Sequence, residues 1–382
     1  MFSQRIKNLQ GSLIREILAA TQRPEVISFA GGLPATDCLP NLDFTGVPAH
    51  LAQYGCTEGE LELREAIAKH ACENLNINCT ADQVLILAGS QQALDLAAKL
   101  YIDEGTPVLT EAPTYLASLQ TLHFFGANIT EIAQENGGLN VQKLNDILQS
   151  EKPPLAYLIP SFQNPSGACY TEENRVQIAQ IFEQNNTTLY EDDPYRDLSY
   201  DGDAPKPIVS HLKKASFIYA GSFSKILAPG LRLGYLIASP DLYPYLVKLK
   251  QANDLHVNRP AQWYVLKEIT KPDFPDHIKK LQASYKIGRD AMQAALEEHF
   301  SDLATWIKPK GGLFFWLKLN KKIDTQELLK ESMKQNIAFM PGEPFFTQPA
   351  ENLGYLRLNF SHASTDNIQK GIKILAGLIR EN

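Results

Sequence analysis

The segment that decides the fold is Phe217-Ile-Tyr-Ala-Gly-Ser-Phe-Ser-Lys-Ile-Leu-Ala-Pro-Gly-Leu-Arg-Leu-Gly-Tyr-Leu-Ile-Ala238. Its apolar runs, Phe217–Ala220 and Leu233–Ala238, predict two short strands. The loop between them is then a tight connection inside a sheet. It places Lys225 among hydroxyls and glycines, close in sequence to Arg232. The alternative is a surface loop with a solvated lysine and arginine, and the flanking strands count against it.

The chemistry available to this loop follows from Lys225. An amine that attacks a carbonyl must be neutral part of the time, and burial or a nearby cation lowers the pKa of a lysine. Arg232 can supply that positive charge. Ser222, Ser224 and Arg232 can also surround a phosphate, because a guanidinium makes forked contacts with oxyanions. A reactive amine beside a phosphate site predicts pyridoxal phosphate as cofactor.

A second phosphate contact is predicted upstream. Val84–Ala88 is a buried-type strand, Gly89-Ser90-Gln91 is a glycine turn, and a helix is expected over Ala93–Tyr101. A helix N-terminus presents unpaired N–H groups, so Ser90 and Gln91 can hold a phosphate. Many turns of this kind bind nothing, and that alternative stays open on the segment alone.

Two further candidates follow predicted strands. Tyr115 comes after the strand Pro107–Thr110, where a flat ring can stack on a pyridine ring or simply fill the core. Asn164 comes after the strand Ala156–Pro160 and precedes a proline, so an extended turn presents its amide. That amide can donate to the phenolate oxygen of the cofactor, although Asn-Pro-Ser-Gly is also common as a simple turn.

An acidic pair follows the strand Thr188–Glu191. A solvated turn is one interpretation. The proposed chemistry needs a buried carboxylate that keeps the pyridine nitrogen protonated, and the family resemblance stated below implies that Asp192, three residues before Tyr195, has that role. Tyr195 is then placed to donate to the phenolate oxygen beside Asn164. Asp193 is expected behind this first layer or facing solvent.

Strand and helix patterns alternate from about Val84 to Ala238, and the polar motifs follow the strand ends. This predicts an α/β fold with a mainly parallel or mixed sheet wrapped by helices, and a ligand at the carboxyl edge of the sheet. After Pro240 the pattern is helical, and Asp276–Phe300 has the length of a helix bridging two domains. We predict a large cofactor-binding domain over 41–275 and a smaller α+β domain from 1–40 and 276–382.

The composition is that of an ordinary globular protein. The 382 residues are 44% hydrophobic and 21% charged, with a net charge of -7, which disfavours nucleic acid and membrane partners. The five cysteines lack the spacing of a disulfide framework or zinc site. The start has no apolar signal core and no run is long enough to span a membrane, so we expect a soluble, cytoplasmic protein without a metal.

These motifs together resemble one family. Ser222-Phe-Ser-Lys225 followed by Pro229-Gly-Leu-Arg-Leu-Gly234 is similar to the lysine region of class I/II, fold-type-I pyridoxal-phosphate aminotransferases. Ser28-Phe-Ala-Gly-Gly-Leu-Pro34 and Gly89-Ser-Gln-Gln92 resemble the subgroup of the 2-aminoadipate and kynurenine enzymes. The resemblance covers essentially the whole chain. Ser166 and Cys56 depart from it at positions where threonine and proline are commoner.

The resemblance implies further residue roles. Arg357 would grip the substrate α-carboxylate through a bidentate fork, with the backbone at Gly32 and the amide of Asn164 close to the substrate. Tyr54 would reach the cofactor phosphate of the partner subunit, which makes the expected assembly a homodimer. Arg15, in a predicted helix over Leu9–Thr21, would meet a distal carboxylate. The alternatives are an exposed strand arginine, a half-buried tyrosine and a solvated helix arginine.

The implied activity is amino transfer between an L-amino acid and a 2-oxo acid. Glutamate and 2-oxoglutarate are the expected pair on one side, with 2-aminoadipate, an aromatic or a branched-chain amino acid as the other donor. Another reaction of the same cofactor, such as β-lyase or decarboxylase action, would use nearly the same residues. A non-catalytic domain of a DNA-binding regulator is disfavoured, because no basic module precedes Arg15 and the net charge is negative.

Overall fold

An eight-stranded sheet organises the part of the chain that the computed structural model describes, which is residues 2–8, 17, 23, 25–135 and 137–381. Its strand order is β2-β9-β8-β7-β6-β3-β4-β5. The strands from β4 through β3, β6 and β7 to β8 run parallel, whereas β9 pairs antiparallel with β2 and β8 and β5 pairs antiparallel with β4. The bounds are β2 Val84–Leu87, β3 Pro107–Ala112, β4 Asn128–Glu135, β5 Gly138–Leu139, β6 Leu155–Leu158, β7 Thr188–Asp192, β8 Phe217–Ser222 and β9 Gly234–Ala238.

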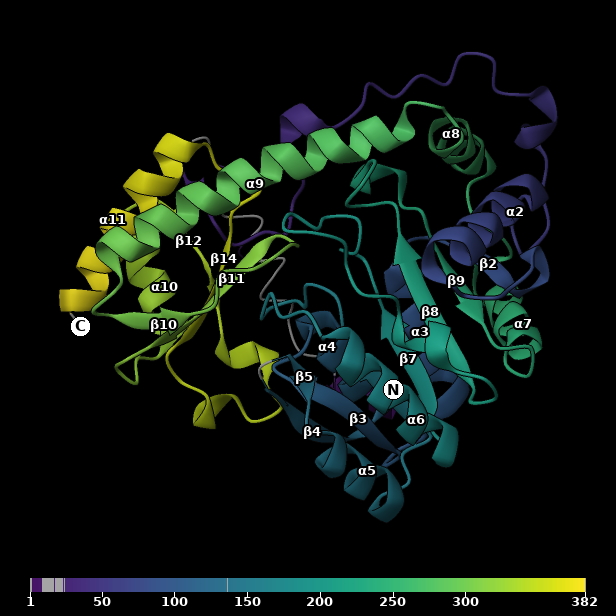
Figure 1. Cartoon of the computed structure of the whole chain (residues 1–382), viewed down its shortest axis with the longest axis horizontal. Helices are drawn as coiled ribbons and strands as arrows, with labels where there is room; N and C mark the ends of the chain where they lie inside the picture. The colour runs from purple at the N-terminus through teal and green to yellow at the C-terminus, as the bar shows by residue number, and fades with distance from the viewer. Residues whose placement is uncertain (1, 9–16, 18–22, 24, 136, 382) are drawn as a thin grey trace.

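Helices cover both faces of this sheet (Figure 1). Successive residues of a strand point to opposite faces, and the two apolar layers divide accordingly: Leu85 and Leu87 pack with α3, while Val84 and Ile86 belong to the layer that includes α2. Strands buried on both faces explain the unbroken apolar runs in the sequence. The helices are α2 Leu61–His70, α3 Ser90–Tyr101, α4 Leu116–Phe125, α5 Val141–Ser150, α6 Glu172–Gln184, α7 Tyr243–Asp254 and α8 Arg259–Ile269.

A smaller antiparallel sheet of order β10-β11-β14-β13 forms beside the large one. In the same region, β1 pairs in parallel with β12. A short N-terminal segment therefore lies beside the C-terminal part of the chain. The helices α10 and α11 pack with these strands (Figure 1). The bounds are β1 Ile27–Ser28, β10 Ala304–Trp306, β11 Phe314–Leu319, β12 Ile337–Ala338, β13 Met340–Pro341, β14 Tyr355–Asn359, α10 Thr325–Lys334 and α11 Thr365–Glu381.

One long helix, α9 (Phe274–His299), connects the two sheets (Figure 1). With 26 residues it spans about 39 Å, and it packs against α11 at its C-terminal half. The α/β class is confirmed, with a large mixed sheet flanked by helices. The domain limits at residues 40 and 275 stay a prediction. Among the described helices, none is both long and apolar enough to cross a membrane.

Most element ends differ from the sequence-based ranges by one to three residues. One difference matters: β3 continues to Ala112, so Glu111 is a strand residue with no exposed surface and not part of the following turn. The predicted helix over Leu9–Thr21, including Arg15, lies outside the described residues apart from Ile17, which is buried.

Candidate active site

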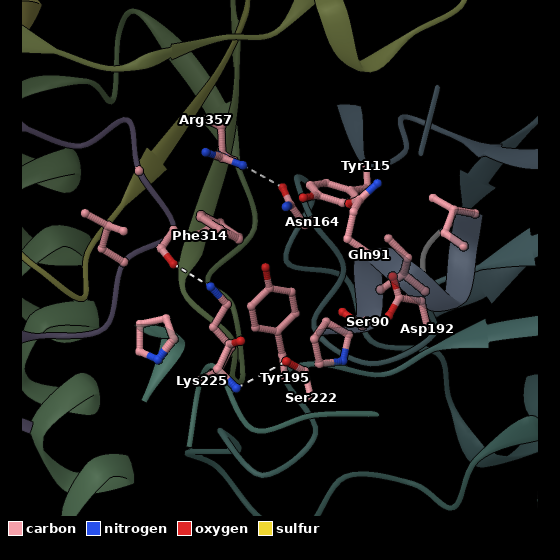
Figure 2. A pocket seen from close by; sticks show the side chains of 18 of the residues that line it. Ser90, Gln91, Tyr115, Asn164, Asp192, Tyr195, Ser222, Lys225, Phe314 and Arg357 are labelled. Carbon is pink, nitrogen blue, oxygen red and sulfur yellow. Dashed lines mark hydrogen bonds between the residues drawn. The ribbon is translucent and has the colours of Figure 1, made fainter. Parts of the chain in front are cut away.

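A cavity of about 250 Å³ opens at the carboxyl edge of the large sheet, facing β11 and β14 of the small one (Figure 2). It collects side chains that the sequence places far apart. Twelve of the predicted site residues line it: Gly32, Ser90, Gln91, Tyr115, Asn164, Asp192, Tyr195, Ser222, Ser224, Lys225, Arg232 and Arg357. They come from the turns after β1, β2, β3, β6, β7 and β8 and from strand β14.

Lys225 projects into this cavity from the turn after β8 (Figure 2). Its Nζ donates to the carbonyl oxygen of Gly32 over 2.8 Å. Burial, together with the charges of Arg357 and Arg232, lowers its pKa to about 8. A substantial fraction of this amine is therefore neutral near pH 8, as attack on a carbonyl requires.

Asp192 ends β7 and is 8% exposed. Its Oδ2 accepts a hydrogen bond from the Tyr157 hydroxyl over 2.6 Å, whereas Oδ1 is buried without a partner among the described residues. Burial raises the pKa of Asp192 to about 7, the Tyr157 hydrogen bond opposes that rise, and the charges of Asp193 and Glu111 add to it. A buried carboxylate with one unpaired oxygen is suited to accept a hydrogen bond from a cationic or N–H group of a ligand.

Two tyrosines and an amide border the middle of the cavity. Tyr115 is the residue before α4, and Tyr195 is 5% exposed with its ring edge against Phe314 at a centroid distance of 5.8 Å. Burial raises the pKa of both hydroxyls, so both remain donors at neutral pH. Asn164 uses its Oδ1 to accept a hydrogen bond, which leaves its Nδ2 as the donor for a ligand.

The opposite end of the cavity is suited to an oxyanion. Helix α3 begins at Ser90, directly after Gly89, whose φ of 87° favours glycine. A Cβ on Gly89 would lie 2.5 Å from Nη2 of Arg232, so only glycine lets the guanidinium reach this turn. The Ser222 hydroxyl accepts from the backbone N–H of Ser224 over 3.2 Å.

Arg357 occupies the side nearest the small sheet and is 3% exposed. Its Nη1 donates to Oδ1 of Asn164 over 2.7 Å and its Nη2 to the carbonyl of Ala30 over 2.5 Å. The guanidinium lies 4.1 Å from the ring centroid of Phe314. No carboxylate pairs with it in the described chain, and burial lowers its pKa to about 10. A buried arginine without a carboxylate is suited to bind one from a substrate.

One predicted residue does not line this cavity. Tyr54 is 76% exposed, and its ring edge contacts His256. Arg15 lies outside the described residues. Of the two places expected for Asp193, the structure has the one behind the first layer: Asp193 is 5% exposed and paired with Arg196, so it does not face solvent.

Sequence reasoning missed Tyr157 and Phe314. Tyr157 lies inside the apolar run of β6 and has the pattern of a core residue. Phe314 belongs to the run Leu313-Phe-Phe-Trp-Leu317, which likewise indicates core. Only the spatial neighbours Asp192 and Arg357 distinguish these two rings from packing residues.

The cavity fits pyridoxal phosphate on its own donor set. A helix N-terminus, two hydroxyls and Arg232 match the phosphate, and the free Oδ1 of Asp192 matches a protonated ring nitrogen. Lys225 supplies an amine for the aldehyde. The remaining cation, Arg357, is left for a substrate carboxylate.

Comparison with known proteins agrees with this geometry. Residues 38–375 match the family model for aminotransferase class I and II. The chain is 37% identical to aromatic-amino-acid aminotransferase 1 of Thermococcus litoralis, over 100% of this chain and 94% of that protein. It is 35% identical to the 2-aminoadipate transaminase of Thermus thermophilus, over 99% and 96%. The crystal structure of Pyrococcus horikoshii kynurenine aminotransferase superposes with a TM-score of 0.94 at 34% identity, covering 100% of this chain and 97% of that one.

The fold and the matched model define an aminotransferase, and the chain belongs to the class I and II family. Within it, the chain falls in the subgroup of the aromatic, 2-aminoadipate and kynurenine enzymes. It is a pyridoxal-phosphate-dependent aminotransferase, as the sequence motifs predicted.

Proposed function

We propose that the cavity described above is the catalytic site and that it transfers an amino group between an L-amino acid and a 2-oxo acid. One observation carries the proposal: Lys225, with a pKa of about 8, lines the same cavity as Asp192, whose Oδ1 is unpaired, and Arg357, which has no carboxylate partner among the described residues. Burying each of these three ionisable groups without an oppositely charged partner destabilises the apoprotein, and a bound ligand of complementary charge would offset that cost.

Pyridoxal phosphate, when bound, supplies an aldehyde for the amine and an electron-withdrawing ring that stabilises negative charge at the substrate α-carbon. The phosphate would be held by Ser90, Gln91, Ser222, Ser224 and Arg232. Asp192 would keep the ring nitrogen protonated. Tyr115 would offer its ring to the pyridine, and Tyr195 and Asn164 would donate to the phenolate oxygen.

The chain's own groups then handle the substrate. Arg357 binds and orients the α-carboxylate beside Asn164 and the backbone at Gly32. Lys225 Nζ removes the proton from the α-carbon of the amino acid donor. In the second half of the reaction it returns a proton to the α-carbon that comes from the 2-oxo acid. The carbonyl of Gly32, 2.8 Å from Nζ, fixes the direction of the amine.

The substrate pair is proposed from relatives as well as residues. Glutamate and 2-oxoglutarate form one pair, and the relatives named for aromatic amino acids, 2-aminoadipate and kynurenine favour a second donor with a long side chain. Arg15 would contact a distal carboxylate. Replacing Arg15 with Ala should then reduce activity on glutamate and 2-aminoadipate more than on apolar donors, and an equal loss on both groups would refute the contact.

The deciding experiment is borohydride trapping of the loaded protein. Saturation with pyridoxal phosphate, reduction and peptide mass analysis should place the label on Lys225. Lys250, a buried lysine whose pKa burial also lowers, provides an internal control because it lies outside the cavity. A label on Lys250, or none, would refute the assignment.

Activity on a panel of donors with 2-oxoglutarate and pyruvate completes the test. Product formation should require a 2-oxo acid acceptor. Release of pyruvate and ammonia without an acceptor would indicate β-lyase chemistry instead.

A further inference from the structure

We propose that the hydroxyl of Tyr157 is the positioning group for Asp192, holding its Oδ2 so that Oδ1 faces the ring nitrogen of the cofactor. The inference rests on the proposed function and extends it to a residue outside the cavity wall. Tyr157 does not line the cavity, and it is fully buried behind the carboxylate. Its hydroxyl is 2.6 Å from Oδ2 of Asp192.

The register of the sheet brings the two groups together. Tyr157 on β6 pairs with Tyr190 on β7, and Asp192 follows Tyr190 by two residues, so all three side chains lie on one face of the sheet. Asp192 is therefore in a diagonal position relative to Tyr157, and a long side chain on one strand can reach a diagonal neighbour on the adjacent strand. Tyr157 is the only residue of this group whose hydroxyl bonds the acid; the Tyr190 hydroxyl is buried without a partner among the described residues.

The bond has an electrostatic consequence. Burial raises the pKa of Asp192, and the hydrogen bond from Tyr157 acts against that rise because it stabilises the ionised form. The other titratable groups that act on the carboxyl are its chain neighbour Asp193 and Glu111 from β3, which raise its pKa. The hydroxyls of Tyr115, Tyr190 and Tyr195 also interact with it electrostatically. Burial also raises the pKa of Tyr157 itself, so it remains a donor throughout the working range. Without this hydroxyl, nothing in the described chain donates to Asp192.

The test compares Tyr157→Phe with Tyr190→Phe. Both changes remove one oxygen from adjacent, fully buried rings whose centroids are 5.3 Å apart, and only the first removes a hydrogen bond to Asp192. Tyr157→Phe should weaken the affinity for pyridoxal phosphate by about tenfold or more, and increasingly so as the pH falls. Tyr190→Phe should stay within about twofold of the parent. Affinity is read from the quenching of protein fluorescence on titration with the cofactor.

A second readout needs neither cofactor nor turnover. In the apoprotein, carbon-13 NMR of labelled aspartate should show the titration of Asp192 moving to higher pH in Tyr157→Phe and unchanged in Tyr190→Phe. If Tyr157→Phe does not fold, the labelled ring carbon of Tyr157 in the parent apoprotein decides the matter: its shift should titrate with the same midpoint as Asp192. A chemical shift of the Tyr157 ring carbon that does not change through the titration of Asp192 would overturn the proposal.

Asp192→Asn separates failure of the inference from failure of the proposed function. If it leaves cofactor affinity unchanged, Asp192 does not meet the ring and the proposed site is wrong. If it weakens affinity while Tyr157→Phe behaves like Tyr190→Phe, the site stands and the positioning role of Tyr157 is refuted.

Discussion

Nη1 of Arg357, on strand β14 of the small sheet, donates to Oδ1 of Asn164, in the turn after β6 of the large sheet, over 2.7 Å (Figure 2). The bond joins the two halves of the cavity. It also fixes the amide so that its N–H faces the cofactor position, while the guanidinium keeps donors for a carboxylate. Substrate binding and cofactor orientation therefore share one contact.

This contact predicts that Asn164→Asp will interfere with substrate binding. The introduced carboxylate would pair with Arg357 and compete with the substrate for the same guanidinium. A buried charge pair of this type is worth about 2–5 kcal/mol, so KM for the amino acid should rise by roughly 10²-fold. Steady-state kinetics on the saturated holoenzyme measure the effect. A fall in kcat at unchanged KM would contradict the competition.

The pKa of Lys225 predicts how covalent loading depends on pH. Only the neutral amine attacks an aldehyde, so the loading rate should rise with pH to a midpoint near 8. After burial, the charge of Arg357 is the largest cause of the low pKa, so Arg357→Met should move the midpoint to higher pH. Pyridoxal, which lacks the phosphate, is the appropriate probe because it avoids the contact with Arg232. Rates are read from borohydride-trapped mass at each pH, and an unshifted midpoint would contradict the coupling.

Much of the site was predictable because its residues follow strands. In parallel strands the carboxyl ends meet at one edge, so Ser90, Tyr115, Asn164, Asp192 and Lys225 could be expected to converge from their positions in the sequence alone. The apolar runs that precede them are long enough to identify, since both faces of the sheet are buried.

Residues inside apolar runs were not predictable in the same way. Tyr157 and Phe314 differ from core aromatics only in their spatial neighbours, and the pairing of β6 with β7 and of β11 with β14 determines those neighbours. Period-2 alternation gives the face of a strand but not its register against another strand. The burial of Arg357 on β14 could not be derived from alternation for the same reason.

The close approach of Gly32 to Phe314 predicts a selective defect in Gly32→Ala. An added Cβ would lie 2.9 Å from Cζ of Phe314, and the ring that supports Arg357 would have to move. The affinity for amino acid and 2-oxo acid should fall by about tenfold, in keeping with a cost of about 1–3 kcal/mol for overpacking. Gly377→Ala, on helix α11 with open space around the added Cβ, should leave kinetics unchanged. Equal kinetics in both variants would refute the steric argument.

The exposure of Tyr54 predicts a role that depends on a second subunit. Tyr54 is 76% exposed and does not line the cavity of its own chain, and the role that we propose for it is a contact with the cofactor phosphate of the partner subunit in a homodimer. Tyr54→Phe should weaken cofactor retention by about tenfold, the value of one hydrogen bond to a charged group, without altering the dimer. Tyr245→Phe removes the hydroxyl of another exposed tyrosine, 55% accessible, and should have no effect. Dialysis of the holoenzyme measures retention and sedimentation measures assembly; a monomer with full cofactor retention would contradict the shared site.

The raised pKa of Asp192 predicts that this acid destabilises the apoprotein at neutral pH. Its pKa is about 7 in the folded state, whereas the ordinary value of an aspartate is 3.8, so the folded state binds more protons than the unfolded state between these two pH values. Stability is therefore lost as pH rises through this window. Asp192→Asn cannot ionise, and its advantage in the free energy of unfolding should grow from less than about 1 kcal/mol around pH 4 to on the order of 4 kcal/mol at about pH 8. Asp201→Asn is the control of opposite sign. The hydrogen bond from Arg289 lowers the pKa of Asp201, so this carboxylate stabilises the fold above the ordinary pKa of an aspartate, and the stabilisation is lost as the pH falls. Urea unfolding of the two apoprotein variants across this pH range measures both trends, and a constant difference for Asp192→Asn would show that folding does not shift the pKa of this carboxyl.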